Sequence, residues 1–216
     1  MIRRRGKIKE RQIPDIEFET RHVSLISIYY AAMHINSGKF KGFPIITKDI
    51  SGTRPTSDKV KQAMFNVLGP AIEGNAALDL FAGFGSLGLE ALSRGAVSAV
   101  FVESKVACAR VIEANIERTG VEAVARVMCM DAFKAMGQLE KEGAVFQIAL
   151  SDAPYGKDMN AKVLNALGDS AILEGGGLLF IQHEKGAGPP AAAQRWQLLK
   201  SYTYGDTAVT LFQKVI

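Results

Sequence analysis

Three glycines and a set of carboxylates mark the part of the sequence that could bind a small molecule. Gly83, Gly85 and Gly88 form a G-x-G-x-x-G pattern between a short apolar run and an apolar-striped segment. Because glycine has no Cβ, such a turn lets the backbone approach a ligand closely, as in nucleotide-like cofactor sites. Alone, the pattern is weak evidence, since many loops with this spacing bind nothing. The carboxylates near this loop indicate which class of cofactor it could bind.

Each of four successive predicted strands carries a carboxylate. The strands are expected over residues 78–81, 99–103, 125–130 and 146–150, and the carboxylates are Asp79, Glu103, Asp131 and Asp152. Because the carboxyl ends of parallel strands meet at one edge of a sheet, these side chains should gather there. One such aspartate is more often a helix cap. Four carboxylates beside apolar strands are costly unless they bind something, so they predict a binding site.

Two cofactor classes compete for this edge. Glu103 lies 20 residues after Gly83, the offset of an acidic side chain that binds a ribose diol. Asp131 could accept the exocyclic amine of adenine, cap the helix that begins at Ala132, or do both. A nicotinamide dinucleotide brings a pyrophosphate, which favours helix N-termini and basic groups. S-adenosylmethionine brings a sulfonium and an ammonium, which favour carboxylates, so we expect this cofactor. The predicted cofactor set is Asp79, Phe81, Gly83, Gly85, Gly88, Glu103, Asp131 and Ala132.

The fourth strand end carries the predicted reaction. Asp152-Ala153-Pro154-Tyr155 resembles the D/N-P-P-Y/F motif of methyltransferases that modify exocyclic amines of bases. Such an amine is a poor nucleophile because its lone pair is delocalised into the ring. Asp152 can accept its N–H groups and aim the lone pair at the methyl group. Tyr155 can stack on a base taken out of its helix. The predicted catalytic set is Asp152, Pro154 and Tyr155. Ala153 replaces the first proline of the motif, and we expect a working but slower enzyme.

The elements that position these residues alternate between strand and helix. Further strands are expected over residues 177–183, 198–204 and 208–214, and helices over 87–94, 106–119, 133–140 and 161–167. This alternation predicts an α/β fold, with a mostly parallel seven-stranded sheet, helices on both faces and a closing antiparallel pair. Ahead of it, residues 34–42 and 45–46 predict a small β-hairpin. A helix containing Val60, Met64, Phe65 and Leu68 should follow, capped by Thr56 or Ser57 and stopped by Gly69-Pro70.

The charges divide the chain into a basic first third and a slightly acidic remainder. Residues 1–70 hold 13 Lys and Arg against 6 Asp and Glu, a balance that attracts phosphate backbones or simply forms a solvated surface. We expect residues 1–32 to be a poorly ordered extension, 33–72 an RNA-facing hairpin and helix, and 73–216 the catalytic domain. The predicted RNA contacts are Lys39, Lys41, Arg54, Thr56 and Lys59, with Lys61 as a further candidate.

The bulk composition excludes several classes of protein. No apolar run reaches the roughly 20 residues of a membrane span. Neither the two cysteines nor the three histidines are spaced as metal ligands or as a disulfide framework, so no metal is expected. A reducing, cytoplasmic setting and a monomer are the default. His183, late in an apolar strand, is expected to be structural, and Phe84 and Trp196 to pack.

From Met33 onward the sequence resembles the RsmD-type bacterial methyltransferases. The matching segments are 37–42, 52–60, 65–68 and 79–96. The resemblance implies a Rossmann-like, class I S-adenosylmethionine-dependent methyltransferase fold. It also implies that the protein methylates a guanine N2 amine in 16S rRNA, either free or in the small ribosomal subunit. Residues 1–32 lie outside the family pattern, which favours Met33 as the natural start.

Three other functions remain open at this point. The protein could be a ribosome-assembly RNA-binding protein whose catalytic loop has decayed at Ala153. It could methylate another exocyclic amine, such as adenine N6, since the same loop residues could position that amine. A nicotinamide-dependent dehydrogenase would require affinity for a dinucleotide, which the acidic edge disfavours.

Overall fold

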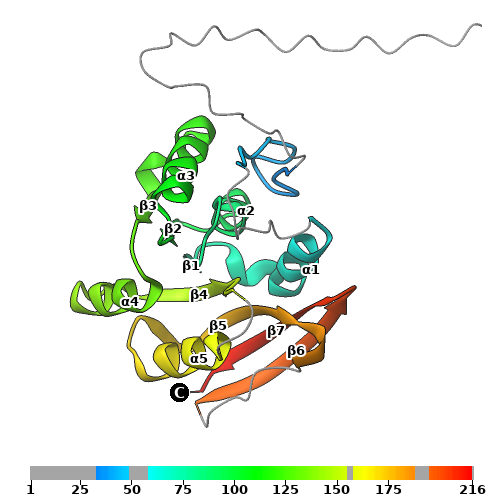
Figure 1. The fold of residues 1–216 in the computed structure, drawn as a ribbon, viewed down its shortest axis with the longest axis vertical. Coiled ribbons are helices and arrows are strands. Elements are labelled where there is room, and N and C mark those ends of the chain that lie inside the picture. Colours follow the sequence, from blue (N-terminus) through cyan, green and yellow to red (C-terminus); the bar gives the residue numbers. More distant parts are fainter. Residues whose placement is uncertain (1–32, 49–57, 155–157, 188–194, 216) are drawn as a thin grey trace, which may run out of the picture.

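A seven-stranded sheet forms the centre of the protein, with helices on both faces (Figure 1). The computed structural model describes residues 33–48, 58–154, 158–187 and 195–215. The strands are β1 (Ala76–Leu80), β2 (Ser98–Val102), β3 (Ala125–Met128), β4 (Phe146–Ser151), β5 (Leu173–Glu184), β6 (Trp196–Tyr204) and β7 (Thr207–Lys214). The α-helices are α1 (Asp58–Leu68), α2 (Ser86–Ser93), α3 (Val106–Thr119), α4 (Ala132–Lys141) and α5 (Met159–Asp169), and the 3-10 helices are η1 (Gly69–Ile72), η2 (Glu122–Val124) and η3 (Lys185–Ala187). Among the described helices, none is long and apolar enough to cross a membrane.

The strand order is β3-β2-β1-β4-β5-β7-β6. The first five strands in this order are parallel, and β7 runs antiparallel to both of its neighbours, β5 and β6. The predicted parallel sheet with a closing antiparallel pair is therefore confirmed. The last strand of the chain lies inside the sheet, between β5 and β6, and β6 forms the edge.

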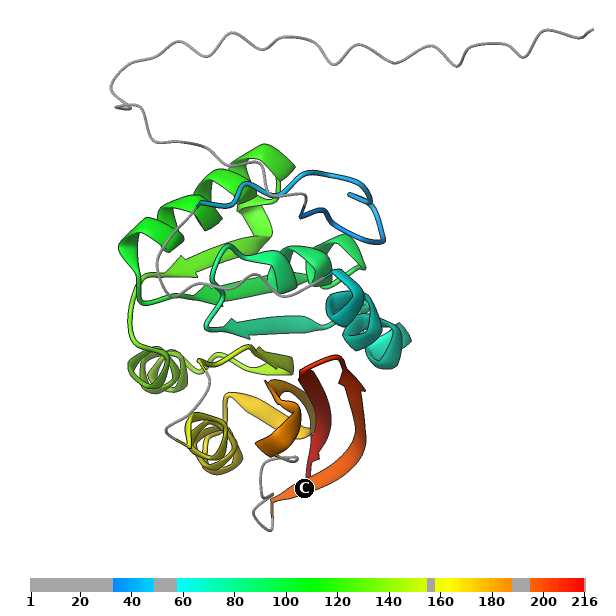
Figure 2. The ribbon, with the colours of Figure 1, turned by 45° about the vertical axis from the view of Figure 1, so that its right-hand side comes forward.

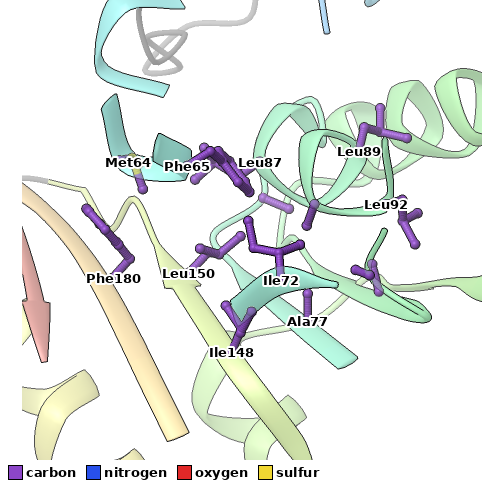
Figure 3. Packing of buried hydrophobic residues seen from close by; sticks show 14 of the residues in the cluster. Met64, Phe65, Ile72, Ala77, Leu87, Leu89, Leu92, Ile148, Leu150 and Phe180 are labelled. Atoms are coloured by element: carbon purple, nitrogen blue, oxygen red, sulfur yellow. The ribbon is translucent and has the colours of Figure 1, made fainter. Parts of the chain in front are cut away.

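Two hydrophobic clusters fill the two faces of the sheet. Successive residues of β1 point to opposite faces, so Ala77 packs in one cluster and Leu78 in the other. Helices α1, α2 and α3 cover the first face, and α4 and α5 cover the second (Figure 2). Figure 3 shows Met64 and Phe65 of α1 packed near Leu150 and Phe180 of the sheet. Residues 33–48 contribute to this same first cluster.

The predicted N-terminal hairpin is a looser structure than expected. Instead of two strands, the segment has a single isolated bridge between His34 and Pro44, with a turn between them. The backbone pairs on either side of this bridge, because the Ile35 N–H donates to the Phe43 carbonyl at 3.0 Å and the Ile45 N–H donates to the Met33 carbonyl at 2.9 Å. The turn itself is bonded to helix α2. The Lys39 N–H donates to the Ser93 carbonyl at 2.7 Å, and the Phe40 N–H donates to Ser93 Oγ at 2.9 Å. Helix α2 therefore anchors the turn of a short hairpin.

The predicted stop of the helix at Gly69-Pro70 is confirmed, since α1 ends at Leu68. The chain continues as the 3-10 helix η1, with Pro70 near its start. A proline fits the first turn of a helix because the N–H that it lacks would have no partner there. The expected caps of α1, Thr56 and Ser57, lie outside the described residues.

Lys61 is buried and does not contact RNA phosphate, contrary to the sequence-based expectation. Its side chain is 0% exposed, and Nζ donates to the His34 carbonyl at 2.6 Å. Asp58 lies 3.4 Å and Glu90 3.8 Å from the same Nζ. Burial lowers the pKa of Lys61, and the two carboxylates raise it in part. Lys61 therefore joins residues 33–48 to helices α1 and α2 from within.

The partner carboxylate, Glu90, is equally buried and has further bonds. It accepts from the Asn36 N–H at 2.7 Å and from Arg94 Nε at 2.7 Å. Two cations and a backbone N–H thus satisfy this one carboxylate. A buried group of this kind is stabilising only while all partners are present.

Replacing Lys61 should therefore lower the stability of the folded protein. We expect Lys61→Met to lower the free energy of unfolding by about 3 kcal/mol, because Glu90 loses a counter-charge and the His34 carbonyl loses its donor. Lys59→Met is the matched control, since Lys59 is the exposed lysine of the same helix turn and its loss should change stability by less than about 0.5 kcal/mol. Urea unfolding measures both. Equal, small losses would contradict this role.

Helix α2 lies so close to β2 that one position tolerates only glycine. A Cβ added to Gly88 would lie 2.2 Å from Cε1 of Phe101. We expect Gly88→Ala to cost about 1–3 kcal/mol of stability, because the ring must move inside a packed core. Gly137→Ala in α4, where an added Cβ meets nothing within 4 Å, should instead stabilise by about 0.5–1 kcal/mol. Thermal unfolding of both variants tests this pair, and a neutral Gly88→Ala would contradict the close approach.

Candidate functional site

The sheet topology brings the four predicted carboxylates toward one edge. Strands β3, β2, β1 and β4 are adjacent and parallel, so their carboxyl ends lie together. Glu103 and Asp152 directly follow β2 and β4, and Asp131 comes three residues after β3. Asp79 differs from the others because it lies inside β1 and points to the face covered by α2. The carboxylates therefore occupy two depths, three at the rim and one beneath it.

The loop between β1 and α2 turns by means of left-handed backbone conformations. Phe81, Gly83 and Gly85 have φ of 61°, 57° and 82°. Gly83 and Gly85 adopt this conformation without strain, whereas Phe81, with its Cβ, does so at a cost. Gly85 is also the N-cap residue of α2. A Cβ on Gly83 would meet no atom of the described residues within 4 Å, so the backbone there is open to a ligand.

Glu103 holds this loop from the neighbouring strand. Its Oε2 accepts from the Gly83 N–H at 2.9 Å, and its Oε1 accepts from the Lys105 N–H at 2.8 Å. The side chain is mostly buried, with 8% of the residue exposed. A carboxylate has about four lone-pair positions, so two remain for hydroxyl donors such as a ribose diol. The predicted role fits a group that already bonds the glycine loop.

Gly88 supports the site from inside the helix. Its N–H donates to Asp79 Oδ2 at 2.8 Å, and its Cα packs against the Phe101 ring. The structure thus gives Gly88 a packing role and shows no opening to a ligand at this position. In the G-x-G-x-x-G pattern, Gly83 and Gly85 therefore shape the loop, whereas Gly88 lets helix α2 pack against β2.

Asp79 is a buried carboxyl group with one unused oxygen. Only 1% of the residue is exposed, and Oδ1 has no hydrogen-bond partner among the described residues. Burial raises the pKa of Asp79 to about 8, the Gly88 N–H lowers it, and the negative charges of Asp152 and Glu103 raise it. An unsatisfied buried oxygen at the base of a loop is a place that a ligand can complete.

Asp131 caps helix α4, as one of its two predicted roles required. Its Oδ1 accepts from the N–H groups of Phe133 at 3.0 Å and Lys134 at 3.1 Å. Both bonds use the same oxygen, and Asp131 is exposed. The cap therefore leaves Oδ2 free of helix bonds, and the second role, toward an adenine amine, is compatible with the first. Ala132 is the buried first residue of α4.

The predicted catalytic segment begins where β4 ends. Asp152 is partly buried, Ala153 is 2% exposed, and Pro154 is exposed. The negative charge of Asp152 raises the pKa of Asp79, so the carboxylates predicted to serve catalysis and cofactor binding are close enough to interact. Tyr155 lies outside the described residues.

The predicted RNA contacts are split between described and undescribed segments. Lys39, Lys41 and Lys59 are exposed, whereas Arg54 and Thr56 lie outside the described residues. Lys39 and Lys41 lie in the turn that Ser93 holds onto α2. Lys39 Nζ lies 5.3 Å from the centroid of the Phe40 ring.

One residue that sequence reasoning missed connects this turn segment to the glycine loop. Asn115 of α3 is 1% exposed, and its Nδ2 donates to the Phe84 carbonyl at 3.1 Å and to the Ile46 carbonyl at 3.0 Å. Its Oδ1 accepts from the Ile46 N–H at 2.8 Å. The sequence held one sign of this role, since Asn115 is a polar residue among the apolar positions of its predicted helix.

His183, Trp196 and Phe84, which were expected to be structural, pack inside the protein. His183 is buried, with Nε2 hydrogen-bonded to Thr210 Oγ1 at 2.8 Å. Trp196 donates from Nε1 to the Leu164 carbonyl at 2.9 Å, and Phe84 packs in a small cluster beside the loop. Among the described residues, no group of histidine, cysteine and carboxylate side chains could hold a metal ion.

The titration of Asp79 gives a test of its environment in the free protein. The folded pKa is raised to about 8, whereas a free aspartate titrates near 4. Between these values the folded protein binds a proton that the unfolded chain has lost, so stability falls as pH rises. Relative to Asp79→Asn, the wild type should lose up to about 1.4 kcal/mol per pH unit between about pH 5 and 8. Urea unfolding at several pH values measures this difference, and a flat difference would contradict a buried carboxyl.

Comparison with known proteins supports a single family. The family model described as "Conserved hypothetical protein 95" matches residues 33–213. The chain is 32% identical to "Ribosomal RNA small subunit methyltransferase D" of Escherichia coli K12 over 84% of this chain and 90% of that protein. It is also 32% identical to YlbH of Bacillus subtilis, over 84% of this chain and 99% of that protein.

Solved structures agree with this result. The structure of yhhF from Escherichia coli matches with a TM-score of 0.75 at 28% identity, covering 85% of this chain and 98% of that one. A hypothetical protein of Thermus thermophilus matches with a TM-score of 0.69 at 30% identity, over 83% and 98% of the two chains. The fold is that of the class I methyltransferases, as predicted. The chain belongs to the Conserved hypothetical protein 95 family, which is the RsmD family that its sequence resembles.

Proposed function

We propose that this protein transfers a methyl group from S-adenosylmethionine to the exocyclic N2 amine of a guanine in 16S ribosomal RNA. Family membership and a relative named as a small-subunit rRNA methyltransferase support the reaction and the RNA class. The carboxylates and the glycine loop at one sheet edge support the cofactor. The guanine N2 specificity rests on the likeness to the family. We further propose that the protein acts as a monomer in the cytoplasm, where ribosomal subunits are assembled.

The observation that carries the proposal is the convergence of two kinds of site on one edge. The glycine loop and Glu103 form a place for a nucleoside, and Asp152 begins a loop directly beside it, across β1 and β4. A methyl donor and an acceptor amine must meet within a few ångströms, in line. Adjacent parallel strands deliver both groups to that meeting point.

The residues present fit S-adenosylmethionine better than a dinucleotide. The cofactor carries positive charge and no phosphate, and the edge offers the carboxylates of Glu103, Asp131 and Asp79. Within the described ranges, Asp79 Oδ1 has no hydrogen-bond partner and no atom blocks the backbone at Gly83. When bound, the cofactor supplies an electrophilic methyl group on its sulfonium. Glu103 would bind the ribose and Asp131 the adenine amine.

Asp152 would make the guanine amine reactive. Its carboxylate accepts the amine N–H groups, which holds the nitrogen close to tetrahedral geometry and directs its lone pair toward the methyl group. Pro154 restricts Ala153 to extended backbone, and so stiffens the loop. Tyr155 would stack on the flipped base. The proton of the methylated amine leaves to Asp152 or to water.

The direct experiment is methyl transfer to a defined RNA. Small ribosomal subunits and free 16S rRNA from cells that lack this protein are incubated with isotopically labelled S-adenosylmethionine, and the nucleosides are identified by mass spectrometry. We expect N2-methylguanosine at one position. N6-methyladenosine would replace the proposed amine with the adenine alternative. RNA and cofactor binding without transfer would favour a protein whose loop has decayed at Ala153.

Substitution of Asp152 separates catalysis from cofactor binding. We expect Asp152→Ala to lower kcat by at least about 100-fold, because the amine loses its acceptor, while the affinity for cofactor changes little. Asp206→Ala is the control, since Asp206 is an exposed aspartate in the β6–β7 turn. Single-turnover assays and calorimetric titration measure the two quantities. Parallel loss of transfer and cofactor affinity would remove Asp152 from the acceptor role.

A further inference from the structure

Asp79 lacks the partner that a buried charged carboxylate needs. The residue is 1% exposed, its Oδ2 accepts one N–H from Gly88, and its Oδ1 has no hydrogen-bond partner in the part of the chain that the structure describes. Among the described residues, no basic side chain forms an ion pair with it. A carboxylate left in this state is strongly unfavourable, and the usual outcome is that the group stays neutral.

The charges on the packed elements add to this effect. Glu103 beyond β2 and Asp152 beyond β4 both act on Asp79 as negative charges. The carboxylate on α2 is Glu90, which forms ion pairs with Arg94 and Lys61. Lys105, the N-cap residue of α3, is exposed. The local balance around Asp79 is thus negative, and it disfavours a further negative charge.

We propose that Asp79 holds a proton in the free protein and releases it to solvent when the positively charged cofactor binds. The O–H bond of the carboxyl breaks, the proton goes to buffer, and the carboxylate that remains is the counter-ion of the ligand. Cofactor binding is then coupled to the release of one proton. This inference rests on the proposed function for the identity of the cofactor, and it adds a chemical role to the buried oxygen.

The coupling follows from the same charges that keep Asp79 neutral. A cation that enters the loop offsets Glu103 and Asp152, and so makes an ionised Asp79 favourable. It also gives the unpartnered Oδ1 a group to interact with. The electrostatic energy of the site is therefore lowest when ligand cation and Asp79 anion are present together.

Calorimetry measures the proton directly. S-adenosylmethionine is titrated into the full-length protein at pH 6.5 in two buffers with different ionisation enthalpies, and the difference in observed heat gives the number of protons released. Because the carboxyl of Asp79 has a pKa of about 8, we expect about one proton per cofactor bound. The dissociation constant should fall by about 10-fold per pH unit between about pH 6 and 7.5.

Two variants assign the proton to one residue. Asp79→Asn should release close to no proton, and its affinity should no longer depend on pH in this range. Asp131→Asn is the matched control, because it removes a more accessible carboxylate of the same predicted cofactor set. It should weaken binding and still release about one proton. The wild-type measurement stands without either variant, should one of them fold poorly.

S-adenosylhomocysteine, which keeps the ammonium and lacks the sulfonium charge, identifies the charge that matters. Proton release with both ligands assigns the effect to the ammonium, and release with S-adenosylmethionine alone assigns it to the sulfonium. Tight binding of S-adenosylmethionine without proton release would overturn the inference and leave the proposed function intact. Absence of binding would overturn the proposed function, and the stability of wild type against Asp79→Asn across pH would then decide whether the free protein holds the proton.

Discussion

One hydrogen bond in the middle of the protein fixes the geometry of the site. The N–H of Gly88, in the first turn of α2, donates to the carboxyl group of Asp79, in β1, at 2.8 Å. The strand and the helix are thereby joined on both sides of the loop between them. The chain has only residues 81–85 in which to reverse direction, and it does so through left-handed conformations at Phe81, Gly83 and Gly85. The open backbone that a cofactor requires is a consequence of that short connection.

The same helix also carries the segment expected to face RNA. At its carboxyl end, Glu90 and Ser93 hold residues 36–40 by hydrogen bonds, and a Cβ on Gly38 would lie 1.8 Å from the Ser93 carbonyl oxygen. Asn115 of α3 makes a second link, from Ile46 to the carbonyl of Phe84 in the glycine loop. The exposed lysines of the N-terminal turn and the cofactor loop thus share one rigid support. A substrate bound by these lysines would therefore have a fixed position relative to the glycine loop.

Much of this arrangement could be predicted, because periodicity reports which side of an element is buried. Helix α3 has the predicted bounds, Val106–Thr119, and the parallel strands lie within a few residues of their expected positions. The glycine spacing predicted the loop, and the alternation of strands and helices predicted that the carboxylates would lie at one edge of the sheet. These features depend on local pattern and on the rule that parallel strand ends share an edge.

Local sequence pattern could not predict the contacts of residues whose partners are distant in the sequence. Lys61 reads as a surface lysine, yet it donates to a carbonyl 27 residues away and lies beside Glu90, on another helix. The turn of the N-terminal hairpin is anchored in the same way, since the Phe40 N–H donates to Ser93 Oγ on α2, 53 residues away. Asp79 looked like another rim carboxylate, but the pleat of β1 turns it inward under α2. Each of these outcomes was decided by tertiary packing.

A crystal structure with bound S-adenosylhomocysteine tests the central claim, that the carboxyl edge of β1 and β2 holds the cofactor beside Asp152. The account predicts the nucleoside against the backbone of Gly83, with the ribose on Glu103, the adenine amine on Asp131, and the sulfur turned toward Asp152. A ligand bound elsewhere, such as between α4 and α5, or a ribose without contact to Glu103, would contradict the account.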